Sequence, residues 1–329
     1  MAAQETPADP RKVVGLAIAL TALLSTLLIA FGLPALHTAP RDVPLALVAP
    51  PQAAQQLAAG LEKAQPGAFA ITTAASQDEA RELIRNREVY GALVVGADGL
   101  QVDLATAASP AVAQIVTGVG QAIATQAGVT ATIEDVVPTT KDDPRAVGLT
   151  AGALPIALGG VMAGVAISLA IAGTWRRVGT MALFAVLAGC AMVAVLQFVF
   201  HTFTGSYPVT SAAAILGIFA TGMTVLGLEQ LLGRVGIGLG ALVVVVVGNP
   251  LSGLASAPEM LPQPWGAIGQ FLPPGATGTL LRNVAFFDGA AIAKPVLVLT
   301  AWLALGLVTF WIGARRSTRS RAAVLEAVA

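Results

Sequence analysis

An acid and an amide lie inside a long apolar run, where polar side chains are rare. Glu229 and Gln230 come near the end of the stretch Val209–Leu232, and an ionisable residue at membrane depth is a functional candidate by default. Such a carboxylate can carry a proton or bind a polar part of a substrate. It can also be structural, through partial pairing with Arg234 or by reaching lipid headgroups, and the sequence leaves both interpretations open.

Two prolines interrupt long apolar stretches in positions that favour bending. Pro155 lies inside the second such stretch, and Asn249-Pro250 lies inside the fifth. A proline removes one backbone hydrogen bond and kinks a helix, and the Asn249 side chain needs a partner or a water-lined cavity. Bent helices beside a cavity suit a conduit that opens, whereas a static kink is the simpler alternative.

The segment 258–290 is apolar and rich in proline, although it connects two predicted spans. Its aromatic residues are of the kind that favours membrane interfaces. Because irregular backbone cannot face hydrocarbon, we expect an outer re-entrant or interfacial hairpin that leans on the spans or lies at headgroup depth. The candidate substrate-binding and gating residues are therefore Pro155, Glu229, Asn249, Pro250, Trp265 and Arg282.

The sequence holds no pattern typical of an enzyme or a metal centre. It lacks a phosphate-binding loop and a nucleophile elbow, and its two histidines and one cysteine do not form a metal-ligand set. Acidic pairs such as Asp78/Glu79 and Asp142/Asp143 suit helix starts and solvated chain ends better than a metal site. The formal net charge is zero. We therefore expect no catalytic activity, no metal, no cofactor and no nucleic-acid partner.

These residues belong to a chain that is too apolar to cover a soluble surface. Hydrophobic residues make up 56% of its 329 residues, charged residues only 11%, and a soluble domain carries about 25% charged residues. Six stretches approach the roughly 20 apolar residues that cross a bilayer, the fifth being Val235–Ala257. The sequence predicts a polytopic α-helical membrane protein with six transmembrane helices and a small α/β extracytoplasmic domain inserted between helices one and two.

The apolar stretches divide the chain into seven segments. We expect a cytoplasmic N-terminal segment at 1–12, transmembrane helix one at 13–36, the extracytoplasmic α/β domain at 37–147, transmembrane helices two to five at 148–257, the outer hairpin at 258–290, transmembrane helix six at 291–313 and a cytoplasmic tail at 314–329. The first apolar run is longer than the roughly 7–15 residues of a signal-peptide core, so we expect an uncleaved anchor.

The basic residues predict the orientation of the spans. Nine of them fall on one side of a six-span arrangement: Arg11, Lys12, Arg176, Arg177, Arg234, Arg315, Arg316, Arg319 and Arg321. Because cytoplasmic loops carry an excess of Lys and Arg, both termini are expected in the cytoplasm. The predicted location is the bacterial cytoplasmic (inner) membrane, crossed several times and in contact with membrane lipids.

Residues 37–147 have the composition and pattern of a small soluble unit. They carry seven basic and twelve acidic residues, and strand-like and helix-like patterns alternate along them. Ser76 followed by Glu79 predicts a capping box at a helix start. Two of the expected strands flank a turn at Ala97-Asp98-Gly99. The pattern therefore favours an α/β fold for this segment.

Glycines in the apolar stretches recur at a spacing that lets helices approach closely within lipid. The pairs are Gly148/Gly152, Gly160/Gly164 and Gly236/Gly240. This spacing suits either tight packing inside one chain or a dimer face, and the sequence does not decide between them.

Two stretches of the chain resemble the type-two ABC-exporter permease superfamily, and within it the stand-alone YhgE/Pip-like branch. The first is DEARELIRNREVYGALVVGADGLQVDLATAASPAVAQIV at residues 78–116, which is similar to the family's outer-domain pattern. The second is GNPLSGLASAPEMLPQPWGAIGQFLPPGATGTLLRNVAFFDG at residues 248–289, which resembles the family's kinked fifth span and proline-rich re-entrant hairpin. The resemblance in architecture covers nearly the whole chain.

The resemblance implies an export permease that works as a homo- or heterodimer, with any ATPase on a separate chain. Permeases of this type place an amphipathic coupling helix between spans two and three, where the ATPase binds. Here that connection is residues 173–179, which is too short for such a helix. Arg176, Arg177 and Arg234 remain for electrostatic docking, although they are also explained as charges that set the topology.

We therefore expect an integral membrane permease-like protein that exports an amphiphilic or envelope-derived substrate. The alternative belongs to a different class, a non-transporting envelope scaffold or surface receptor whose outer domain binds a partner. The short cytoplasmic loops favour this alternative, because a motor subunit would have little to bind.

Overall fold

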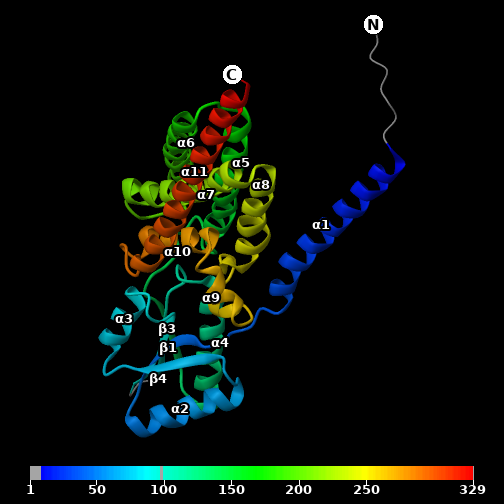
Figure 1. Ribbon diagram of the computed structural model, residues 1–329. Helices are drawn as coiled ribbons and strands as arrows, with labels where there is room; N and C mark the ends of the chain where they lie inside the picture. Colours follow the sequence, from blue (N-terminus) through cyan, green and yellow to red (C-terminus); the bar gives the residue numbers. More distant parts are fainter. Residues whose placement is uncertain (1–8, 97–98, 329) are drawn as a thin grey trace.

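A computed structural model describes residues 9–96 and 99–328 of the chain, without the side chains of 153–154 and 317–328. A helical part and a five-stranded sheet with its helices lie at opposite ends of an elongated molecule (Figure 1). Residues 1–8 of the predicted N-terminal segment, the predicted turn at 97–98 and the side chains of Arg319 and Arg321 lie outside the described part.

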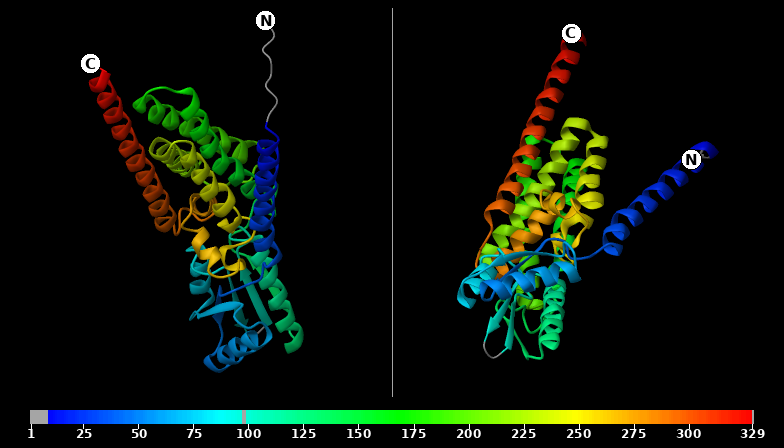
Figure 2. Two further views of the ribbon diagram at one scale, coloured as in Figure 1. Left: turned by 45° about the vertical axis from the view of Figure 1, so that its right-hand side comes forward. Right: turned by 90° about the horizontal axis from the view of Figure 1, so that it is seen from below.

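Within the described ranges, five helices are long and apolar enough to cross a membrane, as expected of a polytopic helical membrane protein. They are α1 (Pro10–Leu36), α5 (Val147–Ala170), α6 (Thr174–Ala194, continued by wider π turns at Val195–Val199), α7 (Tyr207–Leu232) and α11 (Ala293–Val328). Helix α1 stands apart from the others in two views (Figures 1 and 2) and buries none of its residues. Helix α7 is the most buried of the five and lies at the centre of the bundle.

Glycines let the other helices approach α7 closely. A Cβ added at Gly160 would lie 2.9 Å from the carbonyl oxygen of Ile218, and one at Gly306 would lie 2.6 Å from that of Met223. All six glycines of the predicted pairs meet atoms of this same chain within 3.0 Å of an added Cβ. The pairs therefore serve packing inside the chain and give no support to a dimer face.

The predicted fifth span, Val235–Ala257, is not one continuous helix. Helix α8 (Arg234–Ala241) continues in π turns over Leu242–Gly248, and a 3-10 turn follows at Pro250–Ser252. Pro250 has no N–H to continue the helix, and Gly253 adopts the left-handed region at φ 68°. At about 1.5 Å per residue the apolar helix spans about 22 Å, less than the roughly 30 Å hydrocarbon core of a bilayer.

The sheet has the strand order β2-β1-β3-β4-β5, and the pair β3–β4 is the antiparallel one. Its strands are β1 (Val43–Val48), β2 (Phe69–Thr73), β3 (Gly91–Gly96), β4 (Gly99–Leu104) and β5 (Ala131–Asp135). The connections hold α2 (Pro51–Ala64), α3 (Gln77–Arg85) and α4 (Pro110–Ala127). These elements follow the predicted alternation closely.

The helix starts in this unit are set by local capping. The Glu79 N–H donates to the Ser76 Oγ at 3.2 Å, and the Ala75 N–H donates to the Glu79 carboxylate at 2.7 Å. This is the predicted capping box, with the returning bond made one residue earlier than in the usual form. Helix α4 begins in the same way, because the Val112 N–H donates to the Ser109 Oγ at 3.2 Å.

The segment 257–290 joins the sheet to the helical part. It forms a 3-10 turn (Pro258–Met260), α9 (Trp265–Gly269) and α10 (Pro273–Phe286), which Figure 1 shows between the two parts. Met260 and Phe287 are buried in the hydrophobic core of the sheet, whereas Leu281 and Ala285 of α10 are buried among the helices. The segment predicted as an outer hairpin thus consists of short helical pieces, and it belongs to both cores.

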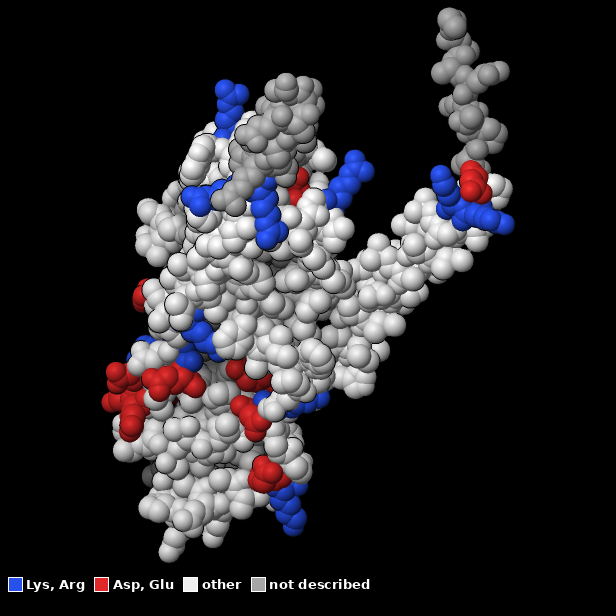
Figure 3. Space-filling model, viewed as in Figure 1, with Lys and Arg blue, Asp and Glu red and all other residues white. Residues whose placement is uncertain are grey.

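Charged residues are distributed unevenly along the molecule. Lys and Arg gather at the end of the helices that lies away from the sheet, and acidic residues gather on the sheet unit (Figure 3). The start of α1 and the end of α11 both lie at that same basic end (Figure 2). The described ends of the chain therefore lie at the same end of the helical part.

Candidate binding site at the junction of sheet and helices

The Arg177 side chain fixes the basic end of the bundle. Its Nε donates to the Ile171 carbonyl and its Nη2 to the Ser168 carbonyl, both at 2.8 Å. Its Nη1 donates to the Gln230 amide oxygen at 2.9 Å and pairs with the Glu229 carboxylate at 3.2 Å. The end of α5 is thereby joined to the end of α7.

This cluster changes the interpretation of two predicted sites. Glu229 is paired with Arg177 rather than with Arg234, which is exposed at the start of α8. The Arg177 side chain is occupied inside the chain, so the exposed Arg176 and Arg234 are the better placed of the three predicted docking residues. Helix α5 ends at Ala170 and α6 begins at Thr174, so the connection is even shorter than expected.

The predicted kink residues lie in two different settings. Helix α5 continues through Pro155, whose side chain is exposed. Asn249 and Pro250 are half-buried at the break of the fifth helix, where the Asn249 carbonyl accepts a bond from the Ser252 Oγ at 2.7 Å. The break leads directly to Leu254, whose carbonyl faces the junction with the sheet.

A cavity of about 560 Å³ lies where the sheet unit meets the helical part. Its walls come from the start of β1, the turn between α3 and β3, the segment 258–270, the middle of α10 and the start of α11. We call it the junction pocket. Its charged or polar wall residues include Arg41, Asp42, Arg87, Glu88, Tyr90, Glu259, Arg282, Asn283 and Lys294.

Arg282 is a buried cation in the wall of the junction pocket. Its side chain is on α10 and is 3% exposed. Its Nη2 donates to the Leu254 carbonyl at 3.2 Å, and its Nε has no partner among the described residues. Burial, and then the nearby charge of Arg87, lower the pKa of Arg282 to about 10, against the opposite effects of Tyr90 and Glu259.

The sheet unit contributes a second guanidinium and a phenol. Arg87 lies over the Phe287 ring, 4.8 Å from its centre, and its Nε also lacks a partner among the described residues. The Tyr90 hydroxyl donates to the Glu259 carboxylate at 2.7 Å. Burial, followed by the charge of Glu259, raises the pKa of Tyr90 well above its usual range, so the phenol stays neutral and donates.

Of the predicted site residues, those from the outer hairpin and the kink come together. Arg282 lines the junction pocket, Trp265 is on α9 beside it at 49% exposed, and Leu254 connects Arg282 to the break at Asn249-Pro250. Glu229 does not belong to this group. It lies near the last turn of α7, whereas the segment that precedes α7 contacts α10 through the Thr204 Oγ1 and the Ala285 carbonyl.

Sequence reasoning missed Arg87 and Tyr90 as site residues. Both follow α3, far along the chain from α10, and a charged residue at a helix end is ordinarily a solvated one. A weak signal was present, because Tyr90 is one of two tyrosines in the chain and a buried tyrosine usually has a hydrogen-bond partner. The partner itself, Glu259, follows from tertiary packing alone.

Several acidic side chains make their bonds within the chain. Asp103 is fully buried and accepts from Arg81 at 2.8 Å, and Arg81 also pairs with Glu134. Asp143 caps α5 by accepting the N–H groups of Val147 and Gly148 at 2.7 Å. In the residues that the structure describes, no three His, Cys, Asp or Glu side chains are placed to hold a metal ion.

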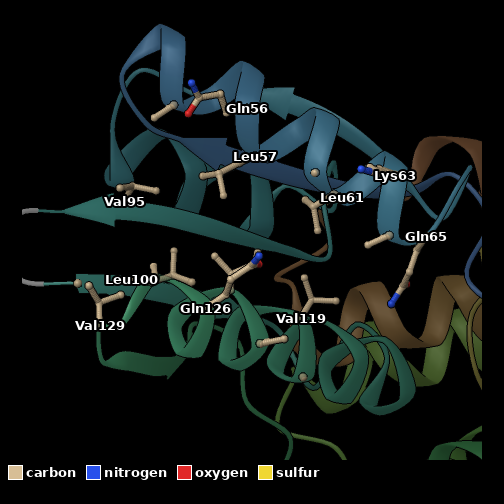
Figure 4. A pocket seen from close by; sticks show the side chains of 18 of the residues that line it. Gln56, Leu57, Leu61, Lys63, Gln65, Val95, Leu100, Val119, Gln126 and Val129 are labelled. Atoms are coloured by element: carbon tan, nitrogen blue, oxygen red, sulfur yellow. The ribbon is translucent and has the colours of Figure 1, made fainter.

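A second and larger cavity lies on the sheet unit, between α2 and α4. Its volume is about 1240 Å³, and apolar side chains form most of its lining. Leu57 and Leu61 of α2 and Val119 of α4 point into it from its two sides (Figure 4). Gly118 on α4 has open space around it. We call this cavity the α2–α4 groove.

The fold and the junction pocket together define a class, a polytopic helical membrane protein with an α/β unit docked on one end of its helices. No family model matches the chain, and no curated protein or solved structure matches it either. The resemblance to the ABC-exporter permeases therefore stays a prediction.

Proposed function

We propose that the chain is a permease-like protein of the bacterial cytoplasmic membrane that exports an amphiphilic or envelope-derived substrate. It acts as a homo- or heterodimer, with any ATPase on a separate chain. Both termini are cytoplasmic, and the α/β unit is extracytoplasmic. Its six membrane segments are the five long helices and the broken fifth one. Arg11, Arg176 and Arg234 lie at the starts of α1, α6 and α8. Lys and Arg gather at the end of the helices away from the sheet (Figure 3), which supports this orientation.

The observation that carries the proposal is the connection between the junction pocket and the broken fifth helix. Arg282 in the pocket wall donates to the Leu254 carbonyl, two residues after the 3-10 turn Pro250–Ser252. A substrate that contacts Arg282 is therefore connected, through the Leu254 carbonyl, to the break in the fifth predicted span. Because irregular backbone at membrane depth occurs where protein or a cavity surrounds it, this break is suited to a gate.

The test is purification of the tagged full-length chain from its native membrane after mild crosslinking, with mass spectrometry of the accompanying proteins. We expect an ATPase subunit in stoichiometric amount. Double replacement of the exposed Arg176→Glu and Arg234→Glu should remove it, whereas Arg11→Glu at the same end should retain it. Absence of any ATPase from the wild-type sample would contradict ATP-driven export.

The α2–α4 groove favours a second candidate, an envelope scaffold or surface receptor. An apolar groove of about 1240 Å³ on the extracytoplasmic unit is large enough to hold part of a partner. Replacement of Gly118→Phe adds a bulky side chain to the lining of the groove, at a position where an added Cβ meets no atom within 4 Å. For the receptor, this variant should lose an envelope partner that the Arg176/Arg234 double variant keeps. Retention of every partner by Gly118→Phe would exclude it.

A further inference from the structure

Unpartnered polar atoms are concentrated at the junction pocket. Five buried side-chain nitrogen or oxygen atoms lack a hydrogen-bond partner among the described residues. Three of them belong to residues that line this pocket, the Nε of Arg87, the Nε of Arg282 and the Oδ1 of Asn283. Buried polar groups are nearly always hydrogen-bonded, so such a concentration points to a missing partner.

The charges around the pocket are not matched either. Arg41 is already occupied, since its two terminal nitrogens donate to the carbonyls of Ala39, Met260 and His37 at 3.0–3.1 Å. Among the described residues, no carboxylate lies within ion-pair distance of Arg87 or Arg282.

The acidic residues of the pocket are used or exposed. Glu259 accepts from Tyr90, Asp42 accepts from Gln263, and Glu88 is exposed. The buried Arg282 and the half-buried Arg87 are thus left without a direct ion pair, an arrangement that an anion bound between them would stabilise.

We propose that the junction pocket binds the anionic head group of an amphiphile, a phosphate or a carboxylate, between Arg282 and Arg87. The inference rests on the proposed function and deepens it, because it names the chemical class of the substrate at the same site. The two guanidinium groups donate to oxygens of the head group, and Lys294 at the start of α11 adds positive charge at the rim.

An apolar strip beside the pocket favours an amphiphile over a free anion. Trp265, Ile268 and Phe271 along α9 and its end are 49%, 39% and 57% exposed. The Lys294 Nζ lies 5.1 Å from the centre of the Phe271 ring, which places the cationic rim next to this strip. Aromatic side chains beside cations are typical of the membrane interface, so an acyl chain can lie along the strip while its head group enters the pocket.

The experiment is a native mass spectrometry titration of the purified full-length protein in detergent. The probes are phosphatidylglycerol, phosphatidylcholine with the same acyl chains, and inorganic phosphate. The variants are Arg282→Gln and Arg87→Gln, with Arg176→Gln as an exposed control at the far end of the bundle. Size-exclusion chromatography establishes that each variant is folded.

Both lipids carry a phosphate, but the choline cation of phosphatidylcholine would lie beside two guanidinium groups. We therefore expect wild-type protein to prefer phosphatidylglycerol by about tenfold to a hundredfold. Arg282→Gln should lose at least about tenfold of the phosphatidylglycerol affinity, and Arg176→Gln should lose none. If Arg282→Gln does not fold, Arg87→Gln and the wild-type preference decide the matter.

Equal affinity of the wild type for the two lipids would overturn the inference, and so would phosphatidylglycerol binding that neither pocket variant weakens. Inorganic phosphate binding that needs Arg282, without any lipid preference, would assign the pocket to a free anion and overturn the amphiphile. Since these titrations involve neither transport nor an ATPase, absence of a motor subunit would refute the export mechanism and leave an observed lipid preference standing.

Discussion

Two arginines at opposite ends of one helical bundle differ in how completely they are paired. Arg177 makes four bonds, to the carbonyls of Ser168 and Ile171 and to the side chains of Glu229 and Gln230. Arg282 makes one, to the Leu254 carbonyl, although it is 3% exposed. Arg177 is therefore a structural clamp, and the bonding of Arg282 is incomplete without a ligand.

The difference separates two kinds of charged residue that look alike in the sequence. A buried or half-buried charge is stable when its neighbours satisfy it, and such a residue needs nothing from outside the chain. Where the neighbours do not satisfy it, the unmet bonding capacity is available to a substrate. The predictions below test this comparison through the two arginines and their neighbours.

The largest expected effect is the loss of the clamp. Replacement of Arg177→Gln leaves the Glu229 carboxylate and two backbone carbonyls without their donor, and we expect the free energy of unfolding to fall by about 3 kcal/mol. Thermal unfolding of the purified protein measures this. Arg176→Gln in the same turn is exposed and should change the stability by less than about 0.5 kcal/mol. Equal effects of the two variants would contradict a clamp.

The second effect has the opposite sign. Replacement of Arg282→Met removes a buried cation that lacks a counter-ion, so the ligand-free protein should gain about 1–3 kcal/mol in unfolding free energy. The loss of one hydrogen bond to the Leu254 carbonyl is included in that range. Thermal unfolding in a neutral detergent measures the change. A loss of stability as large as that of Arg177→Gln would show that Arg282 is satisfied within the fold.

A smaller effect is expected at the acid of the clamp. Replacement of Glu229→Gln keeps a hydrogen-bond acceptor for Arg177 and removes the charge, so we expect a loss of about 1 kcal/mol. Affinity for phosphatidylglycerol should stay at the wild-type value, because the two ends of the bundle are separate sites. A drop in lipid affinity for this variant would instead return Glu229 to the substrate path.

The smallest effect on stability is expected at the apolar strip. Trp265→Ser changes a side chain that is 49% exposed, and we expect less than about 0.5 kcal/mol of change in unfolding free energy. Affinity for phosphatidylglycerol should fall, and affinity for inorganic phosphate should not, because the strip contacts the acyl chain alone. Parallel titrations with the two probes measure this, and equal losses for both would exclude such a role.

Local patterns predicted much of the fold. Ser76 and Glu79 place the start of α3 through bonds within a single turn, and the apolar stretches predict five of the six spans because each is longer than a bilayer needs. The fifth span differs because π turns over Leu242–Gly248 and the proline that follows shorten the helix. The mean hydropathy of a stretch of sequence does not show where a helix changes to π turns or ends.

The sequence singled out part of the surroundings of the junction pocket. Arg282 and Trp265 stood out as a charge and an aromatic side chain in an apolar hairpin, and both lie at the junction pocket or beside it. Arg87 and Tyr90 belong to the sheet unit and come nearly 200 positions before α10 in the chain. The partner of Glu229 was missed for the same reason, because Arg177 is on α6 and Glu229 is on α7, 52 positions further along the chain. Such contacts depend on tertiary packing.

The most direct test of the account is a cryo-electron microscopy map of the full-length protein in nanodiscs that contain phosphatidylglycerol. We predict head-group density within hydrogen-bond distance of the Arg282 and Arg87 guanidinium groups, and no such density at Arg177. An empty junction pocket in which Arg282 forms an ion pair with Glu259 would contradict the account. Arg282 would then be satisfied by the chain itself, as Arg177 is.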